Sequence, residues 1–490
     1  MNKFTSAILF LVLCAAPAPA QQKSQHPFPL PPRKPAAAVP APASQKERAD
    51  LLVTGGTFVT MDPARRLLED GAMAMRGGAI LAIGPRAEIE AQYFTVHRLD
   101  AKGKLVLPGL INAHTHVPMT LLRGLKDDVT LQDWLTHYIF PAEAKNVDEQ
   151  FVRWGTRLAI MEMLRSGTTT FADMYYFEDA IAEETKAAGM RGVLGETFID
   201  FPAPDFKTHA ETLAGAETFL KRWQGDPLIH AAVAPHAIYT NSEQSLHDAA
   251  ALARKYHAPI LIHVAETKKE RDDSIEKNGA SPVAYLERIG LLGPDVLAAH
   301  CIWVDESDRR ILAAHEVGCS HNPGSNMMLA SGVSPIPEMR AAGVRVGLGT
   351  DGPAGSNNDF DLMEEMDLAA KLQKIWKMDP RALGAQAALE MATIEGARAL
   401  HMEKEIGSLE PGKKADFVIL GLDSPNAVPL YDVYSQIVYA LKSGNVETVV
   451  IAGRVVLQYG RVLTLKEREV IAKAREYGVK VAASLKEAGN

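Results

Sequence analysis

The feature that most constrains the fold is a set of short apolar runs, each followed closely by a residue that can bind a metal or carry a proton. The runs lie at 104–111, 258–262, 295–299 and 344–350. The residues that follow them are, in chain order, His114, His116, His263, His300 and Asp351. A (β/α)8 barrel builds its site from several strand ends on one face. The sequence therefore predicts the α/β class and a (β/α)8 TIM barrel.

The pair His114 and His116 indicates a metal site at the first of these strand ends. Side chains alternate along a strand, so two histidines separated by one residue point the same way. Converging neutral imidazoles suit a borderline divalent metal such as zinc. Any one of these residues taken alone could be a core histidine or a helix-capping aspartate, but the set as a whole favours a catalytic metal site.

Apolar runs and helical patterns alternate through the middle of the chain, as in βα units with a parallel sheet. Helices are expected at 151–166 and 176–188, and strands at 167–173, 191–199 and 229–236. Both ends look like β-structure. Strands are expected at 50–54 and 57–61, separated by a turn at Gly55-Gly56, and at 79–83, 415–420, 446–452 and 454–457. A terminal helix is expected over 466–490.

The first residues have the pattern of a secretory signal. A basic start precedes the apolar stretch 7–16, which is too short to span a bilayer, and the small residues 18–20 precede Gln21. We expect a signal peptide over 1–20 that is cleaved after Ala20, with an uncleaved membrane anchor as the alternative. The Pro/Ala-rich residues 21–49 are expected to form a linker, and the protein is expected to be periplasmic or secreted.

Net charge and cysteine content limit the classes of molecule that this protein is expected to bind. The net charge of −8, without a concentrated basic patch, argues against a nucleic-acid surface. Cys301 and Cys319 fall in or beside apolar strands and are expected to behave as small hydrophobic residues. A small-molecule substrate is the simplest partner, with no membrane contact after signal cleavage. The sequence leaves open a monomer or a homo-oligomer.

Several motifs give the chain a family resemblance that extends from about residue 50 to 465. They are Pro108-Gly-Leu-Ile-Asn-Ala-His-Thr-His116, Met119-Thr-Leu-Leu-Arg-Gly124, His263-Val-Ala-Glu266, Ala299-His-Cys301, Ser320-His-Asn-Pro-Gly-Ser-Asn326, Gly349-Thr-Asp-Gly352 and Gly407-Ser-Leu-Glu-Pro-Gly-Lys-Lys-Ala-Asp416. The chain resembles the amidohydrolase superfamily, and within it the mononuclear-zinc deaminases of the S-adenosylhomocysteine/5'-methylthioadenosine deaminase-like group.

The resemblance implies an architecture. Residues 50–107 and 405–465 would pair into one small, discontinuous β-sandwich domain beside the barrel, which would occupy 108–404. The enzyme would be a metal-dependent aminohydrolase acting on a cyclic amidine.

The resemblance also implies roles at the site. One Zn²⁺ per chain would be held by four ligands, which are His114, His116, His263 and Asp351. Glu266 would be the general acid/base, His300 would orient the attacking water, and Asp351 would also pass a proton to the leaving group. The expected fourth strand ends in Pro235-His236, without the lysine or carboxylate of the binuclear relatives, which favours one metal.

The substrate implied is an aminopurine nucleoside of the adenosine, 5'-methylthioadenosine or S-adenosylhomocysteine type. Trp134 would wall the pocket, Glu143 would bind the ribose hydroxyls and His236 would contact the purine; core packing for Trp134 and a solvated helix position for Glu143 are the alternatives. Glu196 is expected where homocysteine-nucleoside deaminases carry a carboxylate-binding arginine, which disfavours S-adenosylhomocysteine.

Two alternative functions stay open. One is hydrolysis of another amino- or chloro-heterocycle such as guanine, 8-oxoguanine or an s-triazine. The other is a non-catalytic binding protein on the same fold.

Overall fold

The computed structural model describes residues 46–486, and the predicted signal peptide and most of the predicted linker lie outside them. Its centre is a closed barrel of eight parallel strands in chain order, from β8 to β15, with β15 pairing back to β8. The strands are β8 (Leu110–Thr115), β9 (Thr168–Tyr175), β10 (Arg191–Phe198), β11 (Ile229–Pro235), β12 (Ile260–Val264), β13 (Val296–His300), β14 (Gly318–His321) and β15 (Arg345–Leu348). The predicted TIM barrel is confirmed.

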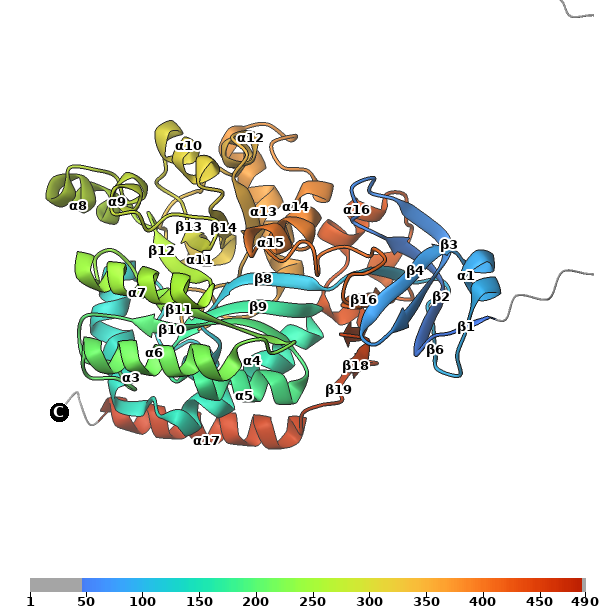
Figure 1. Ribbon diagram of the computed structural model, residues 1–490, viewed down its shortest axis with the longest axis horizontal. Helices are drawn as coiled ribbons and strands as arrows, with labels where there is room; N and C mark the ends of the chain where they lie inside the picture. The colour runs from blue at the N-terminus through green and yellow to red at the C-terminus, as the bar shows by residue number, and fades with distance from the viewer. Residues whose placement is uncertain (1–45, 487–490) are drawn as a thin grey trace, which may run out of the picture. The chain divides into compact units, whose positions relative to one another are not determined.

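Helices surround these strands (Figure 1). After β8 come η1 (Val117–Leu122), α2 (Leu131–Asp133), η2 (Trp134–Ile139), α3 (Phe140–Asn146) and α4 (Glu149–Arg165). The later helices are α5 (Glu178–Ala188), α6 (His209–Trp223), α7 (Glu243–Tyr256), α8 (Lys268–Asn278), α9 (Pro282–Arg288), α10 (Glu306–Ala314), α11 (Pro323–Met328), α12 (Ile336–Ala341), α13 (Leu362–Lys377), α14 (Ala385–Met391) and α15 (Ile394–Ala399).

Local chemistry sets the ends of these helices. Asp148 caps α4 by accepting a hydrogen bond from the Phe151 backbone N–H at 2.7 Å, and α5 ends at Gly189, which adopts the left-handed conformation with φ +74°. The barrel strands are buried almost throughout, because helices cover their outer face and the opposing strands fill the interior.

The two ends of the described chain meet in a second sheet of nine strands. Its order is β19 (Arg461–Val462), β18 (Arg454–Gln458), β17 (Val446–Ile451), β16 (Phe417–Leu420), β7 (Leu105–Pro108), β2 (Leu51–Val59), β3 (Leu67–Arg76) and β4 (Ala79–Pro85), with β6 (Arg98–Asp100) also paired to β2. The expected sandwich thus takes the form of one continuous sheet. The antiparallel pair β7–β16 joins the two ends, and Figure 1 shows the blue N-terminal strands beside the red-orange C-terminal ones.

The expected turn at Gly55-Gly56 is wrong, because β2 runs straight through it. The strand is irregular there: its register with β3 shifts on both sides of Gly56, and Gly55 has φ +87°. A β-bulge with a glycine in the left-handed region accounts for both observations, and it leaves one strand where the glycine pair predicted two.

The remaining elements are short, apart from the last helix. They are β1 (Glu47–Arg48), which pairs with β5 (Tyr93–Phe94), α1 (Arg86–Gln92), η3 (Pro425–Ala427), α16 (Val433–Ser435), η4 (Gln436–Ala440), η5 (Ser443–Asn445) and α17 (Glu467–Lys486). None of the helices in residues 46–486 combines the length and the apolar character that crossing a bilayer requires.

Candidate metal centre and active site

The barrel brings the four predicted metal ligands together. His114 is near the end of β8, His116 follows that strand, His263 lies in β12, and Asp351 follows β15. The Asp351 Oδ1 atom is 3.3 Å from His114 Nε2 and 3.2 Å from His116 Nε2. The ring of His114 lies 4.9 Å, centroid to centroid, from the rings of both His116 and His263.

The hydrogen bonds around these rings leave their Nε2 atoms available. His116 Nδ1 lies 2.6 Å from the Met174 carbonyl oxygen, and His263 Nδ1 lies 2.8 Å from the His236 carbonyl oxygen. A carbonyl can only accept, so each Nδ1 carries a hydrogen and Nε2 is the nitrogen that can bind a metal once it carries no proton. His114 Nε2 is buried without a hydrogen-bond partner among the described residues. Imidazole nitrogens with one carboxylate are a donor set that fits zinc.

The electrostatics agree with a cation site. Burial lowers the pKa of His114 to about 4 and holds that of His263 well below its usual value, so both rings are neutral. For His116, burial acts in the same direction, but hydrogen bonding and attraction to Asp351 outweigh it and raise the pKa to about 9. Asp351 therefore draws positive charge to the point where these side chains meet.

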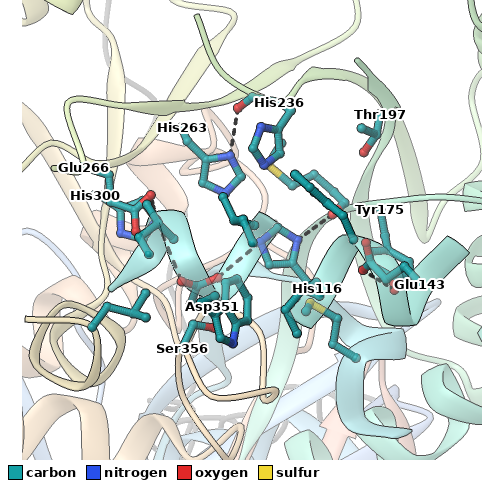
Figure 2. A pocket seen from close by; sticks show the side chains of 18 of the residues that line it. His116, Glu143, Tyr175, Thr197, His236, His263, Glu266, His300, Asp351 and Ser356 are labelled. Atoms are coloured by element: carbon teal, nitrogen blue, oxygen red, sulfur yellow. Dashed lines mark hydrogen bonds and ion pairs between the residues drawn. The ribbon is translucent and has the colours of Figure 1, made fainter. Parts of the chain in front are cut away.

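Glu266 and His300 face this point from neighbouring strand ends (Figure 2). His300 Nε2 is 3.8 Å from Glu266 Oε2 and 3.8 Å from Asp351 Oδ2. His300 Nδ1 lies 3.0 Å from the Asn326 side-chain oxygen and 3.3 Å from the Asn322 side-chain nitrogen, so the Nε2 atom is the one that faces the site. Burial raises the pKa of Glu266, as a proton-carrying carboxyl group requires.

His300 is also close enough to take part in coordination. One ring nitrogen each of His114, His263 and His300 lies within 4.8 Å of the other two. The expectation that His300 orients water rather than binding the metal therefore stays a prediction.

A cavity opens above these groups, and the predicted substrate residues line it. Glu143 is buried and accepts a hydrogen bond from the Tyr175 hydroxyl at 2.7 Å, and burial raises the pKa of Glu143 to about 7. His236 also lines the cavity, and burial lowers its pKa to about 3, so the ring is neutral. Trp134 forms part of the wall, held by a hydrogen bond from its Nε1 to the Ala354 carbonyl at 2.9 Å.

The expectation that Glu196 faces the substrate is wrong. Its neighbour Thr197 lines the cavity, whereas Glu196 does not and instead lines a separate one. Glu196 Oε2 accepts a hydrogen bond from the Glu178 backbone N–H at 3.3 Å, and Asp205 also lines this separate cavity. Successive side chains of a strand alternate between its faces, so a shift of one position changes the side completely.

Sequence reasoning missed three groups that support the site. Tyr175 holds Glu143, Ser325 donates to Asp351 Oδ2 at 2.7 Å, and Asn326 holds His300. Ser325 and Asn326 lie in the motif 320–326, which was identified but given no role. Tyr175 was missed because the strand predicted to end at 173 continues to Tyr175.

Comparisons with known proteins agree with this geometry. The model of the amidohydrolase family matches residues 105–456. A 5-methylthioadenosine/S-adenosylhomocysteine deaminase of Syntrophus aciditrophicus is 45% identical over 443 residues, which cover 90% of this chain and 99% of that protein. A 5'-deoxyadenosine deaminase of Methanosarcina acetivorans is 43% identical, with 87% and 97% covered. The crystal structure of an adenosine deaminase from Xanthomonas campestris with bound zinc superposes with a TM-score of 0.88 at 38% identity, covering 90% of this chain and 100% of that one.

Proposed function

Because the chain belongs to the amidohydrolase family, we propose that it is a zinc-dependent hydrolase that deaminates an aminopurine nucleoside to the inosine-type product and ammonia. The main support for the proposal is that one cavity contains both the metal site and side chains suited to a nucleoside. One part of its lining consists of three of the four metal ligands, His116, His263 and Asp351, together with Glu266 and His300. Its wall holds Glu143 and His236, which are suited to a ribose and a purine.

A zinc ion held by His114, His116, His263 and Asp351 would act as a Lewis acid that makes a water molecule nucleophilic near neutral pH. The zinc bound by the 38% identical adenosine deaminase supports this choice of metal.

Glu266 carries out the first proton transfer, and His300 orients the water from which the proton comes. His300 accepts a hydrogen bond from the attacking water and directs its oxygen at the ring carbon that bears the amino group. Glu266 takes a proton from that water as the carbon–oxygen bond forms, and delivers it to the adjacent ring nitrogen. The raised pKa of Glu266 lets the carboxyl group hold the proton between the two transfers.

Asp351 serves the departure of ammonia. Its Oδ2 faces His300 at 3.8 Å and is hydrogen-bonded by Ser325. From this position it passes the remaining water proton to the amino nitrogen, the carbon–nitrogen bond breaks, and a carbonyl remains on the ring.

The wall of the cavity binds the rest of the substrate. Glu143 accepts hydrogen bonds from the ribose diol, and Tyr175 holds its carboxylate in place. The neutral His236 ring contacts the purine edge, and Trp134 closes the side of the pocket.

Uncharged 5' groups are favoured over the amino-acid group of S-adenosylhomocysteine. Among the described residues, neither lysine nor arginine lines the cavity, so neither side chain is there to form an ion pair with a carboxylate. The lining is instead rich in apolar and aromatic side chains, such as Ile139, Phe140 and Tyr176. Glu196 does not line this cavity, so the preference for adenosine or 5'-methylthioadenosine rests on the uncharged, apolar lining instead.

Export is part of the proposal. Residues 1–20 would direct the chain out of the cytoplasm and be removed, so that the mature protein begins near Gln21 without a membrane anchor. N-terminal sequencing of protein recovered outside the cytoplasm should begin near Gln21, and an intact Met1 would contradict cleavage.

Ammonia release by the zinc-loaded protein tests the function. The panel should contain adenosine, 5'-methylthioadenosine, S-adenosylhomocysteine, adenine, guanine and an s-triazine. We expect adenosine or 5'-methylthioadenosine to give the highest kcat/KM. A higher value for a free base or for the triazine would favour the heterocycle alternative, and zinc binding without any turnover would favour the binding protein.

A further inference from the structure

Asp173 lies buried beneath the metal centre and has no role in the chemistry described above. It is on β9 and is 0% exposed. Its Oδ1 accepts a hydrogen bond from the Val117 backbone N–H at 2.7 Å. It also lies 2.6 Å from the Thr115 hydroxyl, whose single hydrogen it shares with the Ala172 carbonyl oxygen, 2.8 Å from the same hydroxyl. Thr115 and Val117 are the residues on either side of His116, so one carboxylate oxygen holds both neighbours of a metal ligand.

The backbone needs this support because regular pairing ends here. The register between β8 and β9 shifts between Asn112 and Thr115, and η1 begins at Val117. The first N–H groups of a helix have no partner within the helix. Asp173 satisfies the N–H of Val117 and, through Thr115, ties the end of β8 to β9. His116 is thereby held between two fixed points.

A second carboxyl group supports Asp173 from below. The Glu178 side chain is buried, and burial together with the nearby Asp173 carboxylate raises the pKa of Glu178 well above its usual value, while its Oε1 accepts from the Tyr175 backbone N–H at 2.9 Å. Asp173 Oδ2 and Glu178 Oε2 have no donor among the other described residues. One proton shared between these two oxygens satisfies both.

We propose that Asp173 is a positioning residue for His116: by accepting from both Thr115 and Val117, it fixes the His116 imidazole for metal binding. The proposal rests on the metal site of the proposed function but not on the identity of the substrate. Zinc affinity is therefore the quantity that tests the proposal. It can be measured whichever heterocycle the enzyme hydrolyses.

The decisive comparison is between Asp173→Asn and Asp173→Leu. Asparagine keeps an oxygen at the Oδ1 position and places an NH₂ group where it can donate to Glu178, so both hydrogen bonds to the His116 segment persist. Leucine has a similar volume but accepts nothing. Outer partners of metal ligands are typically worth 10–100-fold in metal affinity. We expect zinc affinity, measured by competition with a chelator, to stay within about threefold in Asp173→Asn and to fall about 10–100-fold in Asp173→Leu.

A second pair of variants keeps the test informative if Asp173→Leu does not fold. Thr115→Val removes one of the two donors without changing the shape of the side chain, and Thr115→Ser restores it. Zinc affinity should fall in Thr115→Val and recover in Thr115→Ser.

Asp308 provides the control for lost stability. It is equally buried and accepts from the Asp305 backbone N–H at 3.1 Å, but it does so as the third residue of α10, in a capping box with the N-cap residue Asp305. Asp308→Ala should lower the unfolding temperature of the metal-free protein and leave its zinc affinity unchanged. Equal zinc loss in Asp173→Asn and Asp173→Leu, or full zinc affinity in Asp173→Leu and Thr115→Val, would overturn the proposal.

Discussion

Glu266 is buried, and no lysine or arginine of residues 46–486 pairs with it. Its backbone N–H donates to Glu270 at 2.8 Å, and its carboxyl group faces His300. This isolation raises the pKa of Glu266 through burial, so the group can alternate between carboxylate and acid during turnover.

Glu266→Gln should therefore reduce kcat by about 10²–10⁴-fold, the usual contribution of a general acid/base. Glutamine has nearly the same shape but cannot carry the proton, so the fold and the bound zinc should persist. Steady-state kinetics and elemental analysis of the same preparation check this. Loss of zinc in proportion to activity would show that Glu266 is a ligand instead.

The metal site should hold about one zinc per chain. The donors converge on one point, and His263→Ala removes one of them, so its zinc content should fall sharply. Elemental analysis measures both proteins. Two zinc equivalents, both required for activity, would contradict a mononuclear centre.

Glu143→Ala should raise KM for ribosides about tenfold or more, with little change for the free base. A hydrogen bond to a charged group contributes about 1.5–3 kcal/mol, and only the riboside has the diol. Tyr175→Phe is a milder variant that removes the 2.7 Å hydrogen bond to Glu143. It should also raise KM for ribosides more than for the free base, but by a smaller factor. An equal effect of Glu143→Ala on adenine and adenosine would contradict the assignment.

The sequence predicted site residues that lie at the ends of strands. It did not predict which face of a fully buried strand points into the barrel. His114 and His116 were recognised because two ligands one residue apart share a face. Glu196 was misplaced because every residue of β10 is buried, so no polar alternation marks which side faces the barrel. Asp173 was overlooked because its importance lies in contacts with 115 and 117, more than fifty residues away.

At the scale of elements, the helix α4 sets the position of η1. Gly155 of α4 lies so close to η1 that a Cβ atom there would come within 2.5 Å of the Pro118 carbonyl oxygen. The Thr120 hydroxyl also donates to the Gly155 carbonyl at 2.8 Å. Because η1 begins directly after His116, this contact links helix packing to the metal site.

Gly155→Ala should destabilise the protein by about 1–3 kcal/mol, because backbone atoms must move to admit the methyl group. The shift of η1 should also weaken zinc binding. Gly478→Ala is the matched control, since Gly478 lies on the exposed face of α17 with open space around it and should stabilise the helix by about 0.5–1 kcal/mol. Denaturant unfolding and chelator competition measure the two effects, and unchanged stability in Gly155→Ala would contradict the close contact.

At the scale of the whole molecule, a buried ion pair joins the barrel to the nine-stranded sheet. Arg191 begins β10, and its Nη2 is 2.9 Å from Asp416 Oδ2; the side chains are 0% and 3% exposed. Asp416 Oδ1 also accepts from the Ala452 backbone N–H at 2.6 Å. The pair therefore fixes the start of a barrel strand against the sheet.

Asp416→Asn should lower the free energy of unfolding by about 3–5 kcal/mol, because it leaves the Arg191 charge buried without a counter-ion while keeping an acceptor for Ala452. Urea titration measures the change. The exposed pair Arg310–Glu306 offers the control, and Glu306→Gln should leave stability unchanged. A similar small effect in Asp416→Asn would show that the buried pair does not hold the two parts together.

The sheet built from both chain ends has a consequence for biosynthesis. β7 finds its antiparallel neighbour β16 only after about 300 further residues have been made, and at about 5–20 residues per second the ribosome needs roughly 15–60 s for that stretch. Throughout this interval the newly made β7 presents an unpaired edge to every other chain nearby. A nascent chain of this design is therefore exposed to strand-edge aggregation until its last strands arrive.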